Sequence, residues 1–500
     1  MTVHTASSLE SDTNISADAV IVGSGAGGAT AAYLLARAGK DVVVLEEGGY
    51  HRTEDFEGSI GDLMGKLYRD AGMTPILGKP AIAFAEGCCV GGSTVINGGL
   101  CWRTPQHVLN TWRGAGLPGL DEASLTPIFE ELERDLSISV QDISDSNAAS
   151  RLLIEGCQQL GWAWERVPRA QIDCSNSNRC PTGCPTGAKQ SMLVTYIPKA
   201  LSKGARIYSD ARVTEIVRSG PRAEGVTARV TNGSKTFRLN VKARAVFLAG
   251  GSIQTPYLLL RNGFTHQVGT NLQIHFNLKA VATFPQAIGP QRGTMMTAQV
   301  KQFTGDDMYI GSSNFDPVYL ALTLAPHGHS VVERVTENWR KASIYLVQVK
   351  CAGTGKVINA RLGRPMTYYK LLAEDVRRIH LGLRRLVQLL LAAGAEEVFL
   401  SIAGSSPIRC EADLDKLMSD APDPRRLDIL SVHAMASCPL GMDARTSAAD
   451  AFGLLHGTDN IFIADAGMLP GATGTNPQIT IMAMVYRNIM SILADRNYKL

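Results

Sequence analysis

Three glycines near the start of the chain have the spacing of a dinucleotide-binding turn. The motif Gly23-x-Gly25-x-x-Gly28 follows one short apolar run and precedes a longer run that is rich in Ala and Leu. Such a turn needs Gly23 for its tight bend, Gly25 so that the backbone can approach a pyrophosphate, and Gly28 for close packing of helix on strand. Glu46 ends the next apolar run and is placed to accept hydrogen bonds from a ribose diol. The pattern predicts a bound dinucleotide and does not separate NAD from FAD.

Three of the ten cysteines also lie close together, as Cys174-x5-Cys180-x3-Cys184. Their spacers are small and rich in Gly and Pro, which lets a backbone wrap a metal cluster while its N–H groups point at sulfur. A tetrahedral zinc site would need a fourth ligand, and the sequence offers no histidine nearby. Structural thiols, a metal cluster and zinc therefore remain open. The other seven cysteines are interpreted as small buried apolar residues.

The elements that must hold the glycine motif form a β-strand, α-helix, β-strand unit. The expected elements are a strand at 18–22, a helix at 29–38, a strand at 41–45, further strands at 245–249 and 460–464, a long helix at 365–393 and a last helix at 479–493.

The composition limits the classes of protein to which the chain can belong. Its 500 residues carry a formal charge of +3, and 45% of them are hydrophobic, which is typical of a globular protein of about three domains' length. The absence of basic runs excludes nucleic acid as a partner, and no apolar run approaches the ~20 residues that span a membrane. Residues 1–17 are polar, so we expect a disordered leader without a signal peptide and a cytoplasmic location, with export alongside a partner subunit left open.

Four further segments resemble the motifs of the glucose–methanol–choline (GMC) flavoprotein oxidoreductases. They are Gly87-Cys-Cys-Val-Gly-Gly-Ser-Thr-Val-Ile-Asn97, Gly250-Gly-Ser-Ile-Gln-Thr-Pro256, Gly269-Thr-Asn-Leu-Gln-Ile-His275, and the closing pair of 461–467 and 474–477. The continuation after Asn97 is most similar to the cholesterol oxidase and long-chain alcohol oxidase branches. Ile274 stands where the family usually has an acid.

The resemblance implies FAD as the cofactor. Gly92, Ser93 and Asn97 would lie along the pyrophosphate and the isoalloxazine, Val213 would meet the adenine through its backbone, and Asp465 would lie beside the ribityl-pyrophosphate. Some members attach the flavin through a histidine just before the Asn of the first motif. Ile96 occupies that position here, so dissociable FAD is expected.

The same resemblance singles out two catalytic residues, His433 and Asn476. His433 lies in a segment similar to the one that holds the family's catalytic histidine, and Asn476 occupies the place of its partner. Alcohol oxidation removes a hydroxyl proton and a carbinol hydride; a histidine can accept the proton, and an amide can hold the same oxygen. His275 is expected to be structural.

The cysteine triplet is similar to the [3Fe–4S] ligand run of bacterial FAD-dependent glucose dehydrogenases. This resemblance implies that Cys174, Cys180 and Cys184 would be the cluster ligands. Long-chain alcohol oxidases carry a similar loop, which favours structural thiols. A cluster would pass electrons to a quinone or a redox protein; without one, the flavin could react directly with O₂.

Together these features predict an α/β protein with a Rossmann-like FAD-binding domain and a substrate domain built on a mostly antiparallel sheet with helices. The FAD domain is expected at 18–102, 206–275 and 437–500, and the substrate domain at 103–205 and 276–436.

The expected function is oxidation of a primary or secondary alcohol, bulky and apolar or aromatic, to a carbonyl. Two alternatives stay open: an FAD-containing lyase of the same fold, and a dehydrogenase of a sugar-like polyol with an Fe–S relay. Pocket-lining side chains are expected from Trp102, Trp162, Trp164, Met295 and Met296.

Overall fold

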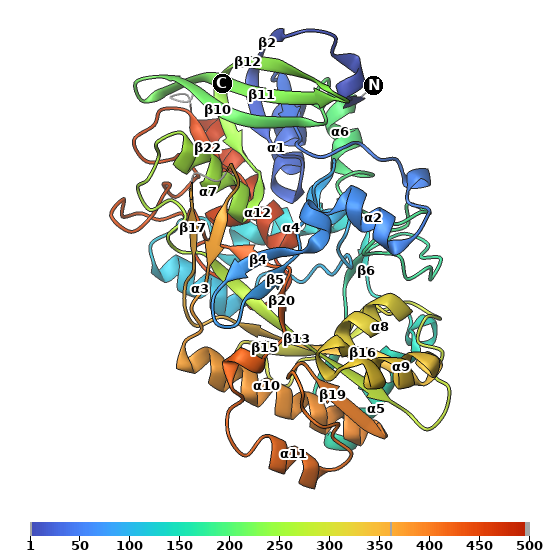
Figure 1. The fold of residues 1–500 in the computed structure, drawn as a ribbon. Helices are drawn as coiled ribbons and strands as arrows, with labels where there is room; N and C mark the ends of the chain where they lie inside the picture. The colour runs from blue at the N-terminus through green and yellow to red at the C-terminus, as the bar shows by residue number, and fades with distance from the viewer. Residues whose placement is uncertain (1–2, 361–362, 496–500) are drawn as a thin grey trace.

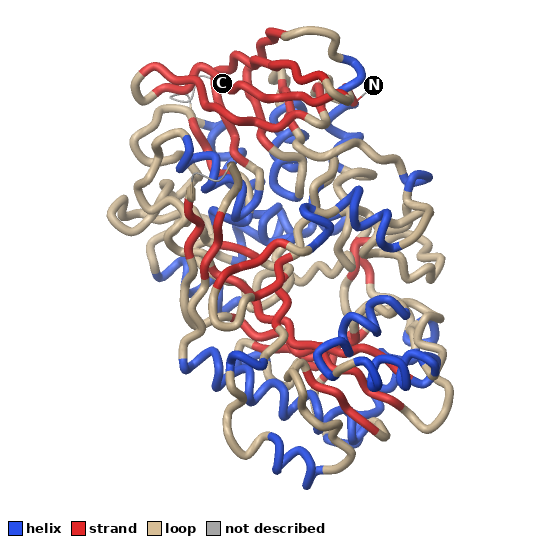
Figure 2. Tube along the Cα trace, in the orientation of Figure 1, coloured by secondary structure: helices blue, strands red, loops and turns tan. Residues whose placement is uncertain are grey.

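The chain folds around two β-sheets stacked end to end, as Figure 1 shows for the computed structural model, which describes residues 3–360 and 363–495. The strands gather in two groups, one toward each end of the molecule (Figure 2). The first and last described residues both lie at the end that holds the first sheet.

The first sheet is parallel over most of its width. Its strands, in order across the sheet, are β1 (Val3–His4), β9 (Arg206–Tyr208), β3 (Val42–Leu45), β2 (Thr13–Val22), β12 (Lys235–Leu248), β11 (Arg222–Asn232) and β10 (Ala211–Ser219), and β22 (Ile461–Ile463) also pairs with β12. Only β10, β11 and β12 run antiparallel to one another. All four residues of β3 are buried, as expected for a β-branched run inside a parallel sheet.

The second sheet is mostly antiparallel. It runs from β17 (Lys356–Ile358) through β18 (Met366–Tyr368), β4 (Thr74–Leu77), β5 (Ile82–Phe84), β20 (Ile429–Ser431), β13 (Gln273–Thr283), β16 (Ala342–Lys350), β15 (Met308–Ser312) and β14 (Ala298–Val300) to β7 (Trp164–Arg166), and both β19 (Glu397–Leu400) and β21 (Ala434–Met435) also pair with β13. The long strand β13 therefore holds the middle of this sheet together.

Helices cover both sheets. They are α1 (Ala26–Arg37), α2 (Ile60–Leu67), α3 (Gln106–Gly114), α4 (Glu122–Asp135), α5 (Ala148–Leu160), α6 (Tyr196–Ser202), α7 (Gly251–Arg261), α8 (Pro317–Leu324), α9 (His329–Glu337), α10 (Ala373–Ala392), α11 (Glu411–Leu417) and α12 (Gln478–Ala494). The helix α1 packs against α12 and α6, while α10 and α5 pack against the second sheet from below in Figure 1. This arrangement confirms the predicted fold class.

Three expectations about individual segments were wrong. The leader is ordered from Val3, because β1 pairs with β9 and β2 begins at Thr13 and pairs with β12 from its first residue. The long helix begins at Ala373, because 366–368 form β18 between β17 and β4. The strands β4 and β5, expected in the FAD-binding domain, belong to the second sheet, and α4 and α6, expected in the substrate domain, pack on helices of the first.

Candidate active site

One cavity of about 540 Å³ lies between the two sheets and brings together ten of the eleven residues predicted for the cofactor and for catalysis. The exception is Gly28, which packs beneath it. The residues that line the cavity are Gly23, Gly25, Glu46, Gly92, Ser93, Asn97, Val213, His433, Asp465 and Asn476. Segments far apart in the sequence therefore meet at one place.

The glycines of the first motif divide into two that are needed for packing and one that leaves space open. A Cβ at Gly28 would lie 2.0 Å from the carbonyl oxygen of Gly23, and a Cβ at Gly23 would lie 2.3 Å from that of Ala249. At Gly25 the nearest atom to a Cβ is the Cα of Gly92, at 3.9 Å. Gly25 is also the N-cap of α1 and provides no side-chain cap. The open space at this helix N-terminus suits a pyrophosphate, which its free N–H groups and dipole would stabilise.

The second glycine motif faces the first across this space. Gly92 has a left-handed backbone (φ +55°), and a Cβ there would lie 2.8 Å from the Cα of Gly25. The Ser93 hydroxyl accepts a hydrogen bond of 2.9 Å from the N–H of Gly87. The Asn97 amide donates to Oε1 of Gln478 at 2.5 Å, which ties this motif to α12.

Glu46 lies in the cavity wall at the end of β3, where its carboxylate accepts three hydrogen bonds. The donors are the N–H of Ser24 (2.9 Å), the Ser24 hydroxyl (2.6 Å) and the N–H of Gly48 (2.9 Å). Burial raises the pKa of Glu46 above its ordinary value. Three hydrogen bonds therefore fix the carboxylate that is predicted to hold a ribose.

Val213 and Asp465 also line the cavity. A bulge interrupts the pairing of β10 with β11 between Val213 and Glu215, so the backbone there departs from the regular ladder beside the cavity. Asp465 accepts hydrogen bonds from the N–H of Gly251 (2.9 Å) and the N–H of Gly467 (2.7 Å) and from the Thr255 hydroxyl. Burial raises the pKa of Asp465 to about 6.

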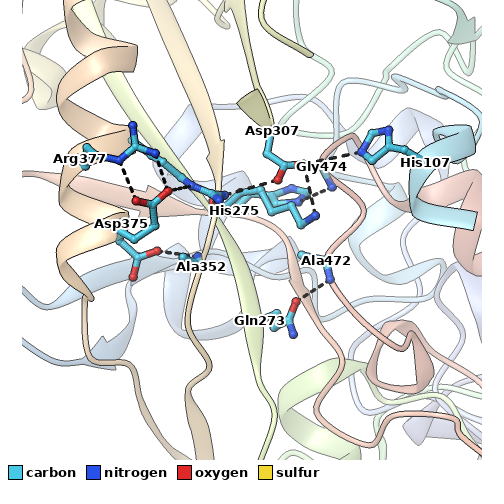
Figure 3. Close-up of polar contacts among 12 residues, drawn as sticks. His107, Gln273, His275, Asp307, Ala352, Asp375, Arg377, Ala472 and Gly474 are labelled. Atoms are coloured by element: carbon cyan, nitrogen blue, oxygen red, sulfur yellow. Dashed lines mark hydrogen bonds and ion pairs between the residues drawn. The ribbon is translucent and has the colours of Figure 1, made fainter. Parts of the chain in front are cut away.

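His433 does not stand alone: its Nδ1 lies 3.0 Å from Nδ1 of His275 on β13. Nε2 of His275 in turn accepts a hydrogen bond of 3.1 Å from the N–H of Gly474 (Figure 3). Two residues earlier on the same face of β13, Oε1 of Gln273 accepts a hydrogen bond of 2.7 Å from the N–H of Ala472. The strand thus contacts both His433 and the loop that leads to Asn476.

Burial favours the neutral form of both rings. It lowers the pKa of His433 to about 4, and burial together with the charges of His433 and Lys350 lowers the pKa of His275 well below its ordinary value. Two neutral rings that meet at their Nδ1 atoms share one proton across this contact. Nε2 is then the nitrogen of His433 left to act on a bound molecule.

Asn476 belongs to a network of amides around one phenol. Burial raises the pKa of the Tyr309 hydroxyl, the nearby side chains of Asn476 and Gln299 oppose that shift, and the hydroxyl donates a hydrogen bond of 2.7 Å to Oε1 of Gln348. Oδ1 of Asn476 and Oε1 of Gln299 have no hydrogen-bond partner among the described residues. Both oxygens are therefore buried acceptors without a partner among the described residues.

Among the described residues, the cysteine triplet is not part of any candidate metal site. Within residues 3–360 and 363–495 no group of three or more His, Cys, Asp or Glu side chains could hold a metal ion, and all ten cysteines are free. The thiol of Cys174 lies near the Thr294 hydroxyl, that of Cys180 accepts from Arg169 (3.5 Å), and that of Cys184 accepts from the N–H of Lys189 (3.4 Å). Each sulfur thus has its own protein partner, and the arrangement gives no support to the predicted [3Fe–4S] cluster.

Several residues of the site gave no signal in the sequence. The ammonium of Lys189 is buried and donates to the carbonyl oxygens of Val95 (2.6 Å), Asn97 (2.8 Å) and Cys180 (2.6 Å), which holds the second glycine motif in place. Arg69 pairs with Glu86 (2.5 Å) and Glu47 (2.9 Å) in the cavity wall. A single buried lysine or a distant ion pair has no local pattern that could have revealed it.

The expected aromatic lining was also wrong. Among the five side chains proposed for it, only Met296 lines the cavity. The Lys301 ammonium lies 3.3 Å from the ring centre of Trp102, and Trp162 packs edge-on against Phe303. These aromatic rings therefore pack within the protein, away from the cavity.

Comparisons with known proteins agree with this geometry. Family models of GMC oxidoreductases match residues 64–277 and 362–484, and a model of an NAD(P)-binding Rossmann-like domain matches 21–63. A GMC-type oxidoreductase of Sinorhizobium fredii is 33% identical over 483 residues, which are 96% of this chain and 95% of that protein. The chain belongs to the GMC oxidoreductase family. This confirms the resemblance, and the protein is an FAD-dependent oxidoreductase that acts on CH–OH donors.

Two other known proteins are also similar to this GMC oxidoreductase. A long-chain-alcohol oxidase of Arabidopsis thaliana is 28% identical over 507 residues, which are 94% of this chain and 66% of that protein. The solved structure of pyridoxine 4-oxidase from Mesorbium loti has the same fold, with a TM-score of 0.73 at 17% identity over 96% of this chain and 99% of that one. In the part of the GMC oxidoreductase that the structure describes, no helix is both long and apolar enough to cross a membrane.

Proposed function

We propose that this protein oxidises a primary or secondary alcohol to the carbonyl with non-covalently bound FAD, and that His433 takes the hydroxyl proton. The observation that carries the proposal is the cavity between the two sheets, because it joins the open glycine turn at Gly25 to the side chains of His433 and Asn476. The chemistry that FAD supplies when bound is acceptance of the carbinol hydride.

The residues of the cavity fit this cofactor. Gly25 and Gly92 leave an uncapped helix N-terminus open to a pyrophosphate, and Glu46 would hold a ribose diol. The bulged backbone at Val213 would meet the adenine. Ile96, buried beside Asn97, offers no nucleophile for a covalent link to the flavin, which supports dissociable FAD.

His433 is suited to accept a proton because burial keeps it neutral at neutral pH. Its Nε2 would receive the hydroxyl proton as the hydride leaves carbon, so the alcohol loses one proton and one hydride and becomes a carbonyl. Asn476, in the same wall, would hold the oxygen of the alcohol in line with His433.

The histidine pair places a condition on this step. For Nε2 of His433 to be free, the shared proton must lie on Nδ1 of His433, so that the proton of His275 lies on Nε2. The N–H of Gly474 now donates to that atom, and the hydrogen bond therefore opposes the base-ready arrangement by about 1 kcal/mol, the net value of one hydrogen bond.

We further propose that O₂ reoxidises the flavin. Support comes from the relatives, since proteins similar to this chain are named long-chain-alcohol oxidase and pyridoxine 4-oxidase. The cysteine loop, with a separate partner for each sulfur, gives no support to an electron relay.

The deciding experiment is anaerobic reduction of the FAD-loaded protein by a panel of alcohols, followed as loss of flavin absorbance at roughly 450 nm. At least one alcohol should bleach the flavin, and His433→Ala should slow bleaching about 100- to 10,000-fold with its FAD content unchanged. His329→Ala, a change of an exposed histidine on α9, is the matched control and should have no effect. Reoxidation in air should release one H₂O₂ per flavin. A flavin that no alcohol bleaches would instead favour a lyase.

A further inference from the structure

Lys279 is a charged residue in the wall that the second sheet contributes to the cavity. It lies on β13 between Leu278 and Ala280, which are fully buried, and its backbone is covered by β16 on one side and by Ser401 on the other. The part of Lys279 that stays accessible is therefore its side chain. Lys279 and Asn277 share one face of the strand, and both line the cavity.

The ammonium group of Lys279 makes no hydrogen bond and no ion pair with a described residue. Because it is not among the fully enclosed polar atoms that lack a partner, its nitrogen is accessible from the cavity. The carboxylate of Asp428 influences its charge but is held apart by Ser401, whose N–H donates to the carbonyl oxygen of Lys279 (3.1 Å) and whose carbonyl oxygen accepts from the N–H of Asp428 (3.0 Å). Two strand spacings, about 9 to 10 Å, thus separate the two backbones.

This cation is isolated in its part of the cavity. Among the lining residues between 277 and 434, only Lys279 carries a charge at neutral pH, because burial keeps His433 neutral. Other charged lining residues, such as Glu46 and Asp465, lie around the glycine motifs. Burial lowers the pKa of Lys279, which indicates that water solvates its charge poorly. An anion that enters the cavity would stabilise such a cation.

Lys279 also lies well away from the proposed proton acceptor. It follows His275 by four residues on β13, which is about 13 Å along the strand. His275 contacts His433 at 3.0 Å, so the strand runs from the proton acceptor to the ammonium. Between them, Asn277 and its cross-strand partner Leu430 line the cavity. A molecule whose hydroxyl lies at His433 can therefore extend along the strand to Lys279.

We infer that the alcohol oxidised here carries a carboxylate or another anionic group at the end remote from its reacting hydroxyl, and that the ammonium of Lys279 binds this group. The inference rests on the proposed function, and it adds a charge to the alcohol expected from the sequence. The substrate is then held by both ends, with its hydroxyl at His433 and its anion at Lys279. A neutral alcohol would leave the ammonium without a partner.

The test compares alcohols of equal chain length that differ only at the far end: 1-octanol, 1,8-octanediol, 8-hydroxyoctanoate and 8-hydroxyoctyl phosphate. Anaerobic flavin reduction is measured on the FAD-loaded protein, and the set is repeated with the butane and dodecane chains. At one chain length or more, the carboxylate or the phosphate should exceed both neutral alcohols at least tenfold in kcat/KM. Lys279→Met should remove this preference, whereas Lys356→Met, a change of an exposed lysine on β17, should keep it.

Binding is measured separately from oxidation, with octanoate as a probe that has no hydroxyl group. Octanoate should perturb the absorbance of the bound flavin, and octanamide, its neutral counterpart, should bind at least tenfold more weakly. Lys279→Met should raise the Kd for octanoate at least tenfold with the FAD content unchanged. The variant should fold, because an apolar side chain of similar length replaces a poorly solvated charge.

The outcomes separate this inference from the proposed function. If the neutral alcohols reduce the flavin as fast as the anions at every chain length, the inference is wrong and the proposed oxidation stands. If Lys279→Met keeps the preference, recognition by Lys279 is wrong. If no alcohol reduces the flavin but octanoate binds through Lys279, the proposed function fails and the anion site stands. The comparison of alcohols on the unaltered protein decides the first point even if Lys279→Met does not fold.

Discussion

The contact between His275 and His433 can be tested sharply, because two substitutions separate the two hydrogen bonds of His275. Its Nδ1 faces His433 at 3.0 Å, and its Nε2 accepts from the N–H of Gly474 at 3.1 Å. Asparagine carries its amide at the position of Nδ1, so His275→Asn keeps a partner for His433 and loses the one for Gly474. Glutamine carries its amide one bond farther out, so His275→Gln keeps Gly474 and loses His433.

The two variants should change rate and stability in opposite ways. In His275→Asn the amide oxygen can accept from Nδ1 of His433 without opposing Gly474, so flavin reduction should equal the original rate or exceed it up to about fivefold, the equivalent of about 1 kcal/mol. In His275→Gln the buried Nδ1 of His433 is left unpaired, which costs about 1 to 3 kcal/mol and should slow flavin reduction about 5- to 150-fold.

The assay is anaerobic stopped-flow reduction of the FAD-loaded variants, together with urea unfolding. His275→Asn should lose about 1 kcal/mol of stability because the N–H of Gly474 has no acceptor, and His275→Gln should stay close to the original protein. A merely structural role would make rate follow stability in both variants. The reasoning is refuted if His275→Asn is as slow as His275→Gln, or if both reduce the flavin at the original rate.

Four other predictions follow from the site. Gly25→Ala should fold normally yet weaken FAD binding at least tenfold, as measured by equilibrium dialysis. Gly28→Ala should instead destabilise the fold by about 1 to 3 kcal/mol, because its Cβ would lie 2.0 Å from a carbonyl oxygen. Thermal unfolding measures this second effect. Glu46→Gln should weaken FAD binding about tenfold or more, measured by the same dialysis, because it removes a charged acceptor. Flavin reduction should be independent of pH between 6 and 8 and fall below about pH 5, since the neutral ring of His433 is active and burial lowers its pKa to about 4; a midpoint near pH 7 would contradict this. Protein purified anaerobically should contain far less than one iron per chain by elemental analysis, and a stoichiometric amount would restore a cluster at 174–184.

Features that depend on neighbouring residues could be predicted from the sequence. The glycines at 23, 25 and 28 and Glu46 lie in one short unit, and their positions follow from the strand, turn and helix that hold them. The start of α1 was misplaced by three residues, since its first turn consists of motif residues that a helix pattern does not mark.

Features that depend on pairing between distant strands could not be predicted from the sequence. His275 and His433 are 158 residues apart and meet only because β21 pairs with β13. The amides around Tyr309 depend on the register of β14, β15 and β16, which short alternating runs do not fix. The cysteine spacing resembled a ligand run, but the loop directs its three sulfurs to separate partners.

The strand β13 shows why the most informative pattern was overlooked. Its residues 273–280 alternate polar and apolar side chains without a break, which ordinarily indicates a strand with one face in the core and the other in water. The apolar side chains at 274, 276 and 278 are indeed in the core. The polar face, however, lies toward the cavity: Gln273 holds the loop before Asn476, His275 contacts His433, and Asn277 and Lys279 line the cavity. At about 6.6 to 6.8 Å per pair of residues, these four side chains span about 20 Å, and a slip of one residue would bury every polar group in the core. The register of one strand therefore sets the position of His433 relative to the loop before Asn476, which is why we expect a change at His275 to affect catalysis as well as stability.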